Sequence, residues 1–276
     1  MSCPGRAARS PQPSPSTTDA VHVAPRPSTA EALFAVLIAE RPERLEAMLA
    51  GDPARAANWV RAAAEQGLPA AQVRCGRMLL EGAGVRRDAS AAAGWFRRAA
   101  KADDADGCNM LGRCLENGWG VSADVSEAAR WYRLAAEADH AWAQYNLGHL
   151  LLDGNGVARD ANEAFAWYRR AADQGHGRAM SLVGRCLEQG WGVAADPARA
   201  RSWYRRSAEA GYFRGQFNWA SALAEDGEID AALPWFEAAL DGAPDESRLA
   251  MLKSLSRSHH APLKALAEAE AAIPCS

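Results

Sequence analysis

The sequence predicts an all-α protein, a solenoid of about five to six helix-turn-helix repeats with helical caps. A tryptophan recurs every 36 residues, at Trp59, Trp95, Trp131, Trp167 and Trp203, and its neighbours recur with it. Apolar residues follow helical spacing on both sides of a glycine-rich segment in each period. A fixed period of this length indicates stacked units, each too small to bury its apolar face alone.

Each period divides into two amphipathic helices joined by a tight turn. In one period, the apolar positions of the first helix are Cys108, Leu111, Gly112 and Leu115, and those of the second are Ala128, Trp131, Tyr132, Ala135 and Ala136. These residues recur at steps of three and four, so each helix turns one face inward. Two glycines within residues 117–121 can adopt positive φ, end the first helix and reverse the chain.

An aspartate is expected to cap the start of each second helix. These aspartates are 36 residues apart, at Asp52, Asp88, Asp124, Asp160 and Asp196. Glu127 and Glu163 follow two of them in the arrangement of a capping box. Gly67, Gly175 and Gly211 stand where a glycine would close the second helix. We therefore assign these repeated positions a structural role.

The combined pattern of small residues, G-x-G-V loop, aspartate and W-Y pair resembles the Sel-1-like repeat, a relative of the tetratricopeptide repeat. Four units fit, over residues 69–212. Their repeated structural positions are Asp88, Asp124, Asp160, Asp196, Trp95, Trp131, Trp167 and Trp203. The resemblance implies a right-handed α-α superhelix whose first helices line a concave face.

The remaining segments are expected to flank these four units. Residues 1–27 read as a disordered Pro- and Ser-rich tail, and residues 28–68 as an N-terminal helical cap with a partial repeat. Residues 213–242 form a divergent unit without the G-x-G-V loop, and residues 243–276 provide C-terminal capping helices. Terminal caps are expected because the end units of a solenoid must cover an apolar face.

The composition is that of an ordinary soluble protein. The chain has 276 residues and a formal net charge of −3, which gives no bias toward nucleic acid or a membrane surface. Six cysteines show no paired spacing, so neither a disulfide framework nor a zinc site is expected. We find no signal peptide and no apolar run long enough to span a bilayer, and expect a cytoplasmic monomer. Abundant Ala and Arg suggest a bacterial source.

Candidate binding residues follow from the positions that point into the groove of tetratricopeptide arrays. One such column contains Arg77, Arg113, His149 and Arg185. These side chains either contact a partner or pair with acids on their own helices, since Glu81, Glu116 and Glu188 lie three or four residues after the three arginines.

The third unit places aromatic residues in the same groove. Trp142, Tyr145 and His149 stand where other units have polar residues. They form either a binding anchor or, for Trp142, a packing contact between adjacent helices. Trp119 and Trp191 in the loops of alternate units either form an exposed edge or cover the loop of the next repeat.

No catalytic motif is present, and the sequence predicts neither a metal site nor a cofactor. His259, His260 and Cys275 lack convincing ligand spacing. We expect a non-enzymatic adaptor that binds a peptide or helix of another protein. The alternatives are a small-molecule site or hydrolase, as in cysteine-rich family members associated with penicillin binding, and an accessory subunit of a neighbouring enzyme.

Overall fold

The described chain is built from α-helices alone. The computed structural model describes residues 51–272, all within one compact unit that spans residues 40–276, and these residues contain thirteen helices and no strand. In order they are α3 (Pro53–Glu65), α4 (Pro69–Glu81), α5 (Ala89–Lys101), α6 (Ala105–Asn117), α7 (Val125–Glu137), α8 (Ala141–Asp153), α9 (Ala161–Asp173), α10 (Gly177–Gln189), α11 (Pro197–Glu209), α12 (Phe213–Glu225), α13 (Ile229–Asp241), α14 (Asp245–Ser256) and α15 (Ala261–Ala271). The predicted all-α class is confirmed. The expected tail over residues 1–27 and the start of the N-terminal cap lie outside the described residues.

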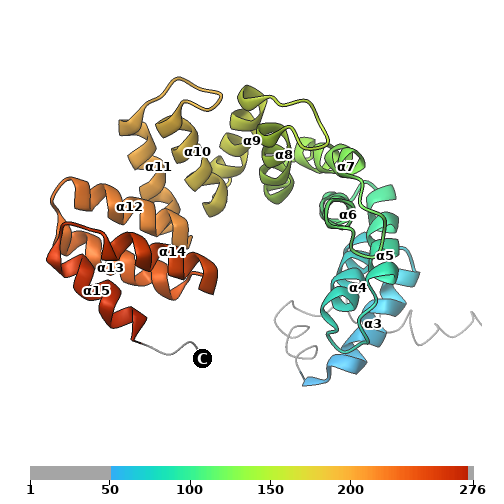
Figure 1. Cartoon of the computed structure of the whole chain (residues 1–276). Helices are drawn as coiled ribbons and strands as arrows, with labels where there is room; N and C mark the ends of the chain where they lie inside the picture. Colours follow the sequence, from blue (N-terminus) through green and yellow to red (C-terminus); the bar gives the residue numbers. More distant parts are fainter. Residues whose placement is uncertain (1–50, 273–276) are drawn as a thin grey trace, which may run out of the picture. The chain divides into compact units, whose positions relative to one another are not determined.

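Helices α4 to α11 form four successive hairpins. Each of these helices has 13 residues and packs against its hairpin partner and against a neighbouring hairpin. The first helices of neighbouring hairpins also touch, as α4 touches α6 and α10 touches α12. This nearest-neighbour packing, visible in the order of the helices in Figure 1, is the arrangement of a helical-repeat solenoid.

The predicted aspartate caps are confirmed. Asp124 accepts a hydrogen bond of 2.8 Å from the backbone N–H of Glu127 at the start of α7. The equivalent caps are Asp52, Asp88, Asp160 and Asp196. Such a side chain satisfies one of the backbone donors that a helix leaves unpaired at its first turn. Each second helix therefore starts at a position fixed by its own sequence.

The reciprocal half of the expected capping box does not form. Glu127 accepts a 3.3 Å hydrogen bond from the indole Nε1 of Trp131 one turn later, and Glu163 does the same for Trp167 at 3.0 Å. The backbone N–H of Asp124 instead donates to the carbonyl of Leu115, at 2.9 Å. The glutamates therefore orient the repeated tryptophans, because the cap donor already has a partner in the preceding helix.

The two loop glycines have different roles. Gly118 ends α6 with φ of 70°, in the left-handed region that favours glycine. Gly120 has φ of 71°, and a Cβ atom there would lie 2.1 Å from the carbonyl of Ala89, at the start of the second helix of the preceding unit. The loop therefore also sets how closely neighbouring hairpins approach.

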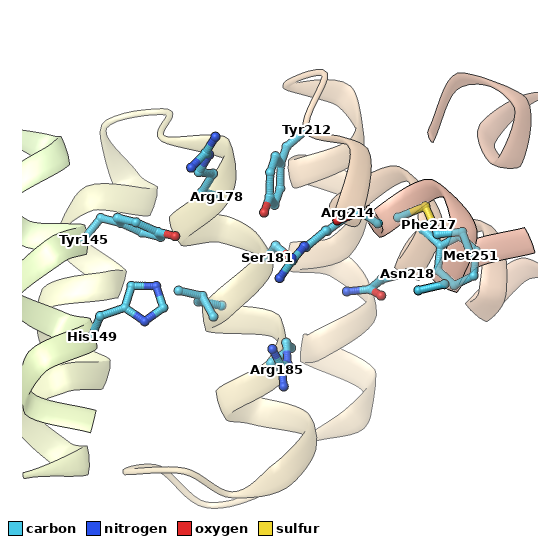
Figure 2. Close-up of a pocket in the computed structure, with 13 residues that line it drawn as sticks. Tyr145, His149, Arg178, Ser181, Arg185, Tyr212, Arg214, Phe217, Asn218 and Met251 are labelled. Atoms are coloured by element: carbon cyan, nitrogen blue, oxygen red, sulfur yellow. The ribbon is translucent and has the colours of Figure 1, made fainter. Parts of the chain in front are cut away.

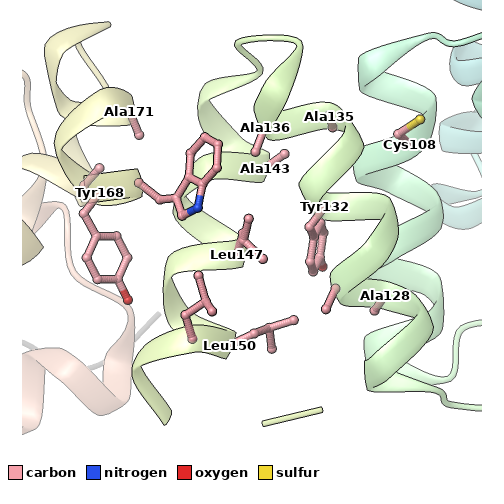
Figure 3. Packing of buried hydrophobic residues seen from close by; sticks show 14 of the residues in the cluster. Cys108, Ala128, Tyr132, Ala135, Ala136, Ala143, Leu147, Leu150, Tyr168 and Ala171 are labelled. Atoms are coloured by element: carbon pink, nitrogen blue, oxygen red, sulfur yellow. The ribbon is translucent and has the colours of Figure 1, made fainter. Parts of the chain in front are cut away.

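In each of the four hairpins, the residue after the repeated tryptophan is a buried aromatic, and Trp167 and Trp203 are buried as well. Tyr132 is fully buried, whereas Trp131 is only partly buried. Gly112 in α6 allows this packing, because a Cβ there would lie 2.7 Å from the Tyr132 ring. The same glycine–aromatic contact joins Gly76 to Phe96, Gly148 to Tyr168 and Gly184 to Tyr204. Figure 3 shows the tyrosines among small side chains such as Ala128 and Ala171, which leave room for the rings.

The last two hairpins have a core of their own. Helices α12 and α13 are joined by residues 226–228, whereas α10 and α11 are joined by residues 190–196. Buried side chains from Ala220 to Ala267 form a second hydrophobic cluster, in contact with the first through the partly buried Trp219. Arg248 in α14 and Glu270 in α15 form a largely buried ion pair that holds this end together.

Candidate partner-binding groove

Two neighbouring cavities lie along the first helices of the hairpins, and we call them together the groove. The N-terminal cavity, of about 820 Å³, is lined mainly by α4, α6 and α8. The C-terminal cavity, of about 350 Å³, is lined by α8, α10, α12 and α14. Tyr145 and Arg178 line both cavities, so the two hollows adjoin at α8 and α10.

All six residues expected to meet a partner line this groove. Arg77, Arg113 and Trp142 line the N-terminal cavity, His149 and Arg185 line the C-terminal cavity, and Tyr145 lines both. In Figure 2, Tyr145 and His149 from α8 face Arg178 and Arg185 from α10 across the C-terminal cavity. The groove therefore collects side chains from four first helices.

The expected pairing of the column arginines with acids on their own helices is wrong. Arg77 pairs with Asp106 of the next hairpin, both carboxylate oxygens lying 2.7 Å from its Nη2. Glu116 and Glu188 instead accept hydrogen bonds from the hydroxyls of Tyr132, at 2.6 Å, and Tyr204, at 3.1 Å. In these two hairpins, the tyrosine of the second helix takes the acid that helical spacing assigned to the arginine of the first helix.

Arg113 and Arg185 lie over tryptophan rings. The Arg113 guanidinium is 5.1 Å from the centre of the Trp119 ring, and that of Arg185 is 5.2 Å from the centre of the Trp191 ring. Both indoles are partly buried and pack against the main core, so they do not form the exposed edge considered from the sequence. Each loop tryptophan instead positions the arginine of its own hairpin by a cation–π contact.

An aromatic cluster occupies the middle of the groove. Its members are Trp142, Tyr145, His149, Tyr168 and His176. The rings of Trp142 and His176 meet edge to face with centres 4.4 Å apart, and those of Tyr145 and His149 with centres 4.6 Å apart. Trp142 remains 46% exposed, so it both packs against a neighbouring hairpin and presents its indole to the groove.

The two histidines of this cluster are neutral at pH 7. Burial lowers the pKa of His176 to about 4, and the nearby Arg178 and His140 act in the same direction. Burial also lowers the pKa of His149 below its usual value. His176 Nδ1 caps α10 by accepting from the backbone N–H of Ala179 at 3.2 Å, and its Nε2 has no hydrogen-bond partner within residues 51–272. The two histidines therefore add aromatic surface but no charge to the middle of the groove, where Arg178 is the charged side chain.

Two further arginines and two aromatic residues line the C-terminal cavity without having been singled out from the sequence. They are Arg178, Tyr212, Arg214 and Phe217. A signal was available, because Arg214 follows Arg178 by 36 residues and Phe217 follows Ser181 by 36. The first helix of the divergent unit keeps the repeat register, since the shortened loop comes only after α12.

Nothing within the described part of the chain assembles a metal site or a reactive thiol. No group of three or more His, Cys, Asp or Glu side chains there is arranged to hold a metal ion. Cys75, Cys108, Cys114 and Cys186 are unpaired and buried, and burial raises the pKa of Cys108, Cys114 and Cys186 to about 11. They act as small apolar core residues. No described helix is long and apolar enough to cross a membrane.

Paired helices in register and a side-chain-lined groove define a helical-repeat protein of the tetratricopeptide-like class. The chain belongs to the Sel1 repeat family, whose model matches residues 47–68, 69–104, 105–140, 143–176 and 177–212. Sel1 repeat proteins generally mediate protein–protein interactions, and their fold is typically a non-catalytic scaffold.

Solved structures agree with this assignment. A Sel1 repeat protein from Oxalobacter formigenes is 33% identical over 82% of this chain and 89% of that chain, with a TM-score of 0.61. The protein c5321, a protective antigen present in uropathogenic Escherichia coli strains and displaying an SLR fold, is 27% identical over 87% of this chain and 56% of that chain, with a TM-score of 0.66. The search of curated proteins gave no match.

Proposed function

We propose that this protein is a non-enzymatic scaffold that binds a peptide or helix of a partner protein in its groove. The observation that supports this most directly is the exposure of large aromatic and charged side chains that the repeat core does not use. Trp142 is 46% exposed in the groove, whereas the equivalent position of other units is Asp106, Arg178 or Arg214. The other units pack without a large apolar residue at this position. The core therefore does not need the Trp142 indole, which is available to a partner.

The groove has the composition of a protein-binding surface. Trp, Tyr and Arg dominate the energetics of many protein interfaces, because they combine a large contact area with directional polar groups. Here Trp142 and Tyr145 lie between Arg113 and Arg185, both on first helices. An extended segment or a single helix fits such a row, since each hairpin supplies the next contact along it.

The arginines are held in place before a partner arrives. Trp119 and Trp191 fix the guanidinium planes of Arg113 and Arg185, at 5.1 Å and 5.2 Å. A side chain positioned in the free protein loses less conformational entropy on binding. The guanidinium edges can then donate to a carboxylate or carbonyl of the partner. This scaffold function involves no cofactor and no chemical step.

Affinity capture from a native lysate tests the proposal. The wild-type chain is compared with Arg113→Glu/Arg185→Glu, after circular dichroism has shown that both are helical. Because charge reversal places a carboxylate against the bound segment, we expect at least about a tenfold loss of captured partner.

A matched control is available on the second helices. Arg98 and Arg206 also lie over tryptophan rings, 4.5 Å from Trp95 and 4.0 Å from Trp203, but outside the groove. Arg98→Glu/Arg206→Glu should capture the partner as the wild type does. Equal loss in both double variants, or none in the groove variant, would contradict binding in the groove.

A further inference from the structure

We infer that the C-terminal cavity recognises an acidic stretch of the partner, with carboxylates held by Arg178, Arg185 and Arg214 beside an apolar side chain. This rests on the proposed groove-binding function and specifies the chemistry of the bound segment. It also gives the segment a direction along the groove.

The positive charge of this cavity is not neutralised. Its lining contains three arginines and no aspartate or glutamate. None of the three forms an ion pair with a carboxylate in the described part of the chain. The charge of these three arginines is therefore not compensated by a carboxylate either within the cavity or beside it.

Aromatic rings take the place of carboxylates beside these arginines. The Arg178 guanidinium lies near both Trp142 and Tyr212, 5.3 Å and 5.7 Å from the ring centres. Arg185 is 5.2 Å from Trp191, and Arg214 is 5.6 Å from Phe213. A ring contacts the face of a guanidinium and leaves its N–H edge available, and that edge matches the two oxygens of a carboxylate.

Apolar side chains line the other side of the same cavity. Phe217 and Met251 lie opposite Tyr145 and His149 in Figure 2. Met251 is buried and belongs to the second core cluster, so core packing holds this wall in place. A segment whose carboxylates meet the arginines would place a neighbouring aliphatic or aromatic side chain against this wall, where apolar contact adds to the affinity.

The N-terminal cavity contains carboxylates, unlike the C-terminal cavity, and this difference sets the direction in which the bound segment lies along the groove. Asp106 and Glu81 line it beside four arginines, and Asp106 pairs with one of them, Arg77, at 2.7 Å. The hydrogen bond from His140 and the charge of Arg77 lower the pKa of Asp106, so this carboxyl is ionised at neutral pH. An acidic stretch is therefore attracted more strongly over α10 and α12, where no carboxylate lines the cavity. The less acidic part of the segment therefore lies over α4 and α6.

A protein segment fits these charges better than a nucleic acid does. A polynucleotide carries a phosphate at every step and would meet Asp106 and Glu81 as soon as it extended beyond one cavity. The whole chain is also slightly acidic, at −3. A peptide can carry carboxylates at one end only, and so it suits both cavities.

Selection from a random dodecapeptide phage library, on the immobilised full chain at low salt, tests the inference. We expect enriched peptides that carry Asp or Glu next to an aliphatic or aromatic residue. Their affinity should fall at least about tenfold in Arg178→Gln/Arg214→Gln and should also fall as NaCl rises. Arg98→Gln/Arg206→Gln serves as the control and should bind them as the wild type does.

The outcomes separate this inference from the broader function. Peptides that are not acidic but lose binding in Arg113→Glu/Arg185→Glu would overturn the inference and leave groove binding intact. Peptides insensitive to every groove variant, or no enrichment at all, would overturn both. Displacement of selected acidic peptides by single-stranded DNA but not by poly-glutamate at equal charge would show that the cavity takes phosphate, and would also overturn the inference.

Discussion

At the scale of single residues, the same repeat position has different surroundings in different units. The hydroxyls of Tyr132 and Tyr204 donate to Glu116 and Glu188. The third unit has Leu152 at that place, and the buried hydroxyl of Tyr168 has no partner in the described structure. Burying a polar group without a hydrogen bond costs more than an apolar group of the same shape.

Tyr168→Phe is therefore expected to stabilise the protein, whereas Tyr132→Phe destabilises it. Removing the unpartnered hydroxyl should raise the free energy of unfolding by about 1 kcal/mol, and removing the Tyr132 hydroxyl should lower it by about the same amount. Urea denaturation followed by circular dichroism measures both. Destabilisation of equal size in the two variants would show that the Tyr168 hydroxyl is satisfied.

His176 links stability to pH. Its folded pKa of about 4 lies below the ordinary value of 6.5, so the unfolded chain takes up the proton first as the pH falls. The stability due to neutral His176 is complete above pH 6.5 and is lost progressively down to pH 4. A shift of this size corresponds to about 3 kcal/mol, which the partial solvent exposure of the ring reduces to about 2 kcal/mol. The lowered pKa of His149 acts in the same direction.

We expect His176→Asn to remove most of this pH dependence. Asparagine can still cap α10, and it does not titrate. Thermal denaturation at pH 4.5 and pH 7.5 should show a smaller loss of Tm in the variant than in the wild type. The titration of carboxylates is common to both proteins and cancels in the comparison. Equal losses would contradict a neutral, buried His176.

At the scale of the elements, each hairpin depends on a glycine that lets its helices approach. A Cβ at position 148 would lie 2.6 Å from the ring of Tyr168, which is fully buried and cannot move aside. Gly94 in α5 is also inside a helix, but nothing lies within 4 Å of a Cβ placed there. Alanine substitutions at Gly148 and Gly94 therefore separate the effect of core packing on stability from that of helix propensity.

Gly148→Ala is expected to lower stability and Gly94→Ala to raise it. Alanine favours a helix over glycine by about 1 kcal/mol, and overpacking a core costs about 1–3 kcal/mol. The net result is a loss of up to about 2 kcal/mol at position 148 and a gain of about 0.5–1 kcal/mol at position 94. Thermal unfolding of the two variants measures these changes, and stabilisation by Gly148→Ala would refute the close packing of α8 on α9.

At the scale of the described solenoid, the helices share two apolar clusters. One runs from Val73 to Tyr204, and the other from Ala220 to Ala267, with Trp219 between them. In an array of nearest-neighbour contacts, a local loss of packing spreads mainly to the adjoining hairpins. The two ends of this array should therefore respond separately to core substitutions.

Phe236→Ala should increase amide hydrogen exchange in α12 to α15 and leave α6 and α7 protected. Phe236 is 2% exposed in the second cluster, and truncating such a ring costs about 3–5 kcal/mol. Leu111→Ala is the matched substitution in the first cluster and should have the opposite distribution. Exchange measured by mass spectrometry resolves the segments. A uniform increase along the chain would contradict two separate clusters.

Features governed by neighbouring residues could be predicted from the sequence. The cap by Asp124 depends on the backbone three residues on, and the positive φ of Gly118 depends on glycine itself. Partners from other helices could not be predicted. Helical spacing assigned Glu116 to Arg113, but Tyr132 from α7 takes that acid, and Trp119 takes the arginine.

The sequence by itself determined the family, the helix pairs and the residues that face the groove, because a 36-residue period repeats every local rule in the same register. Only the tertiary structure decided the charge of that groove. Asp106 reaches across from α6 to neutralise Arg77, while Arg178, Arg185 and Arg214 meet aromatic rings and keep their charge for a ligand. Electrostatic pairing depends on distances between hairpins, and no spacing within one helix specifies them.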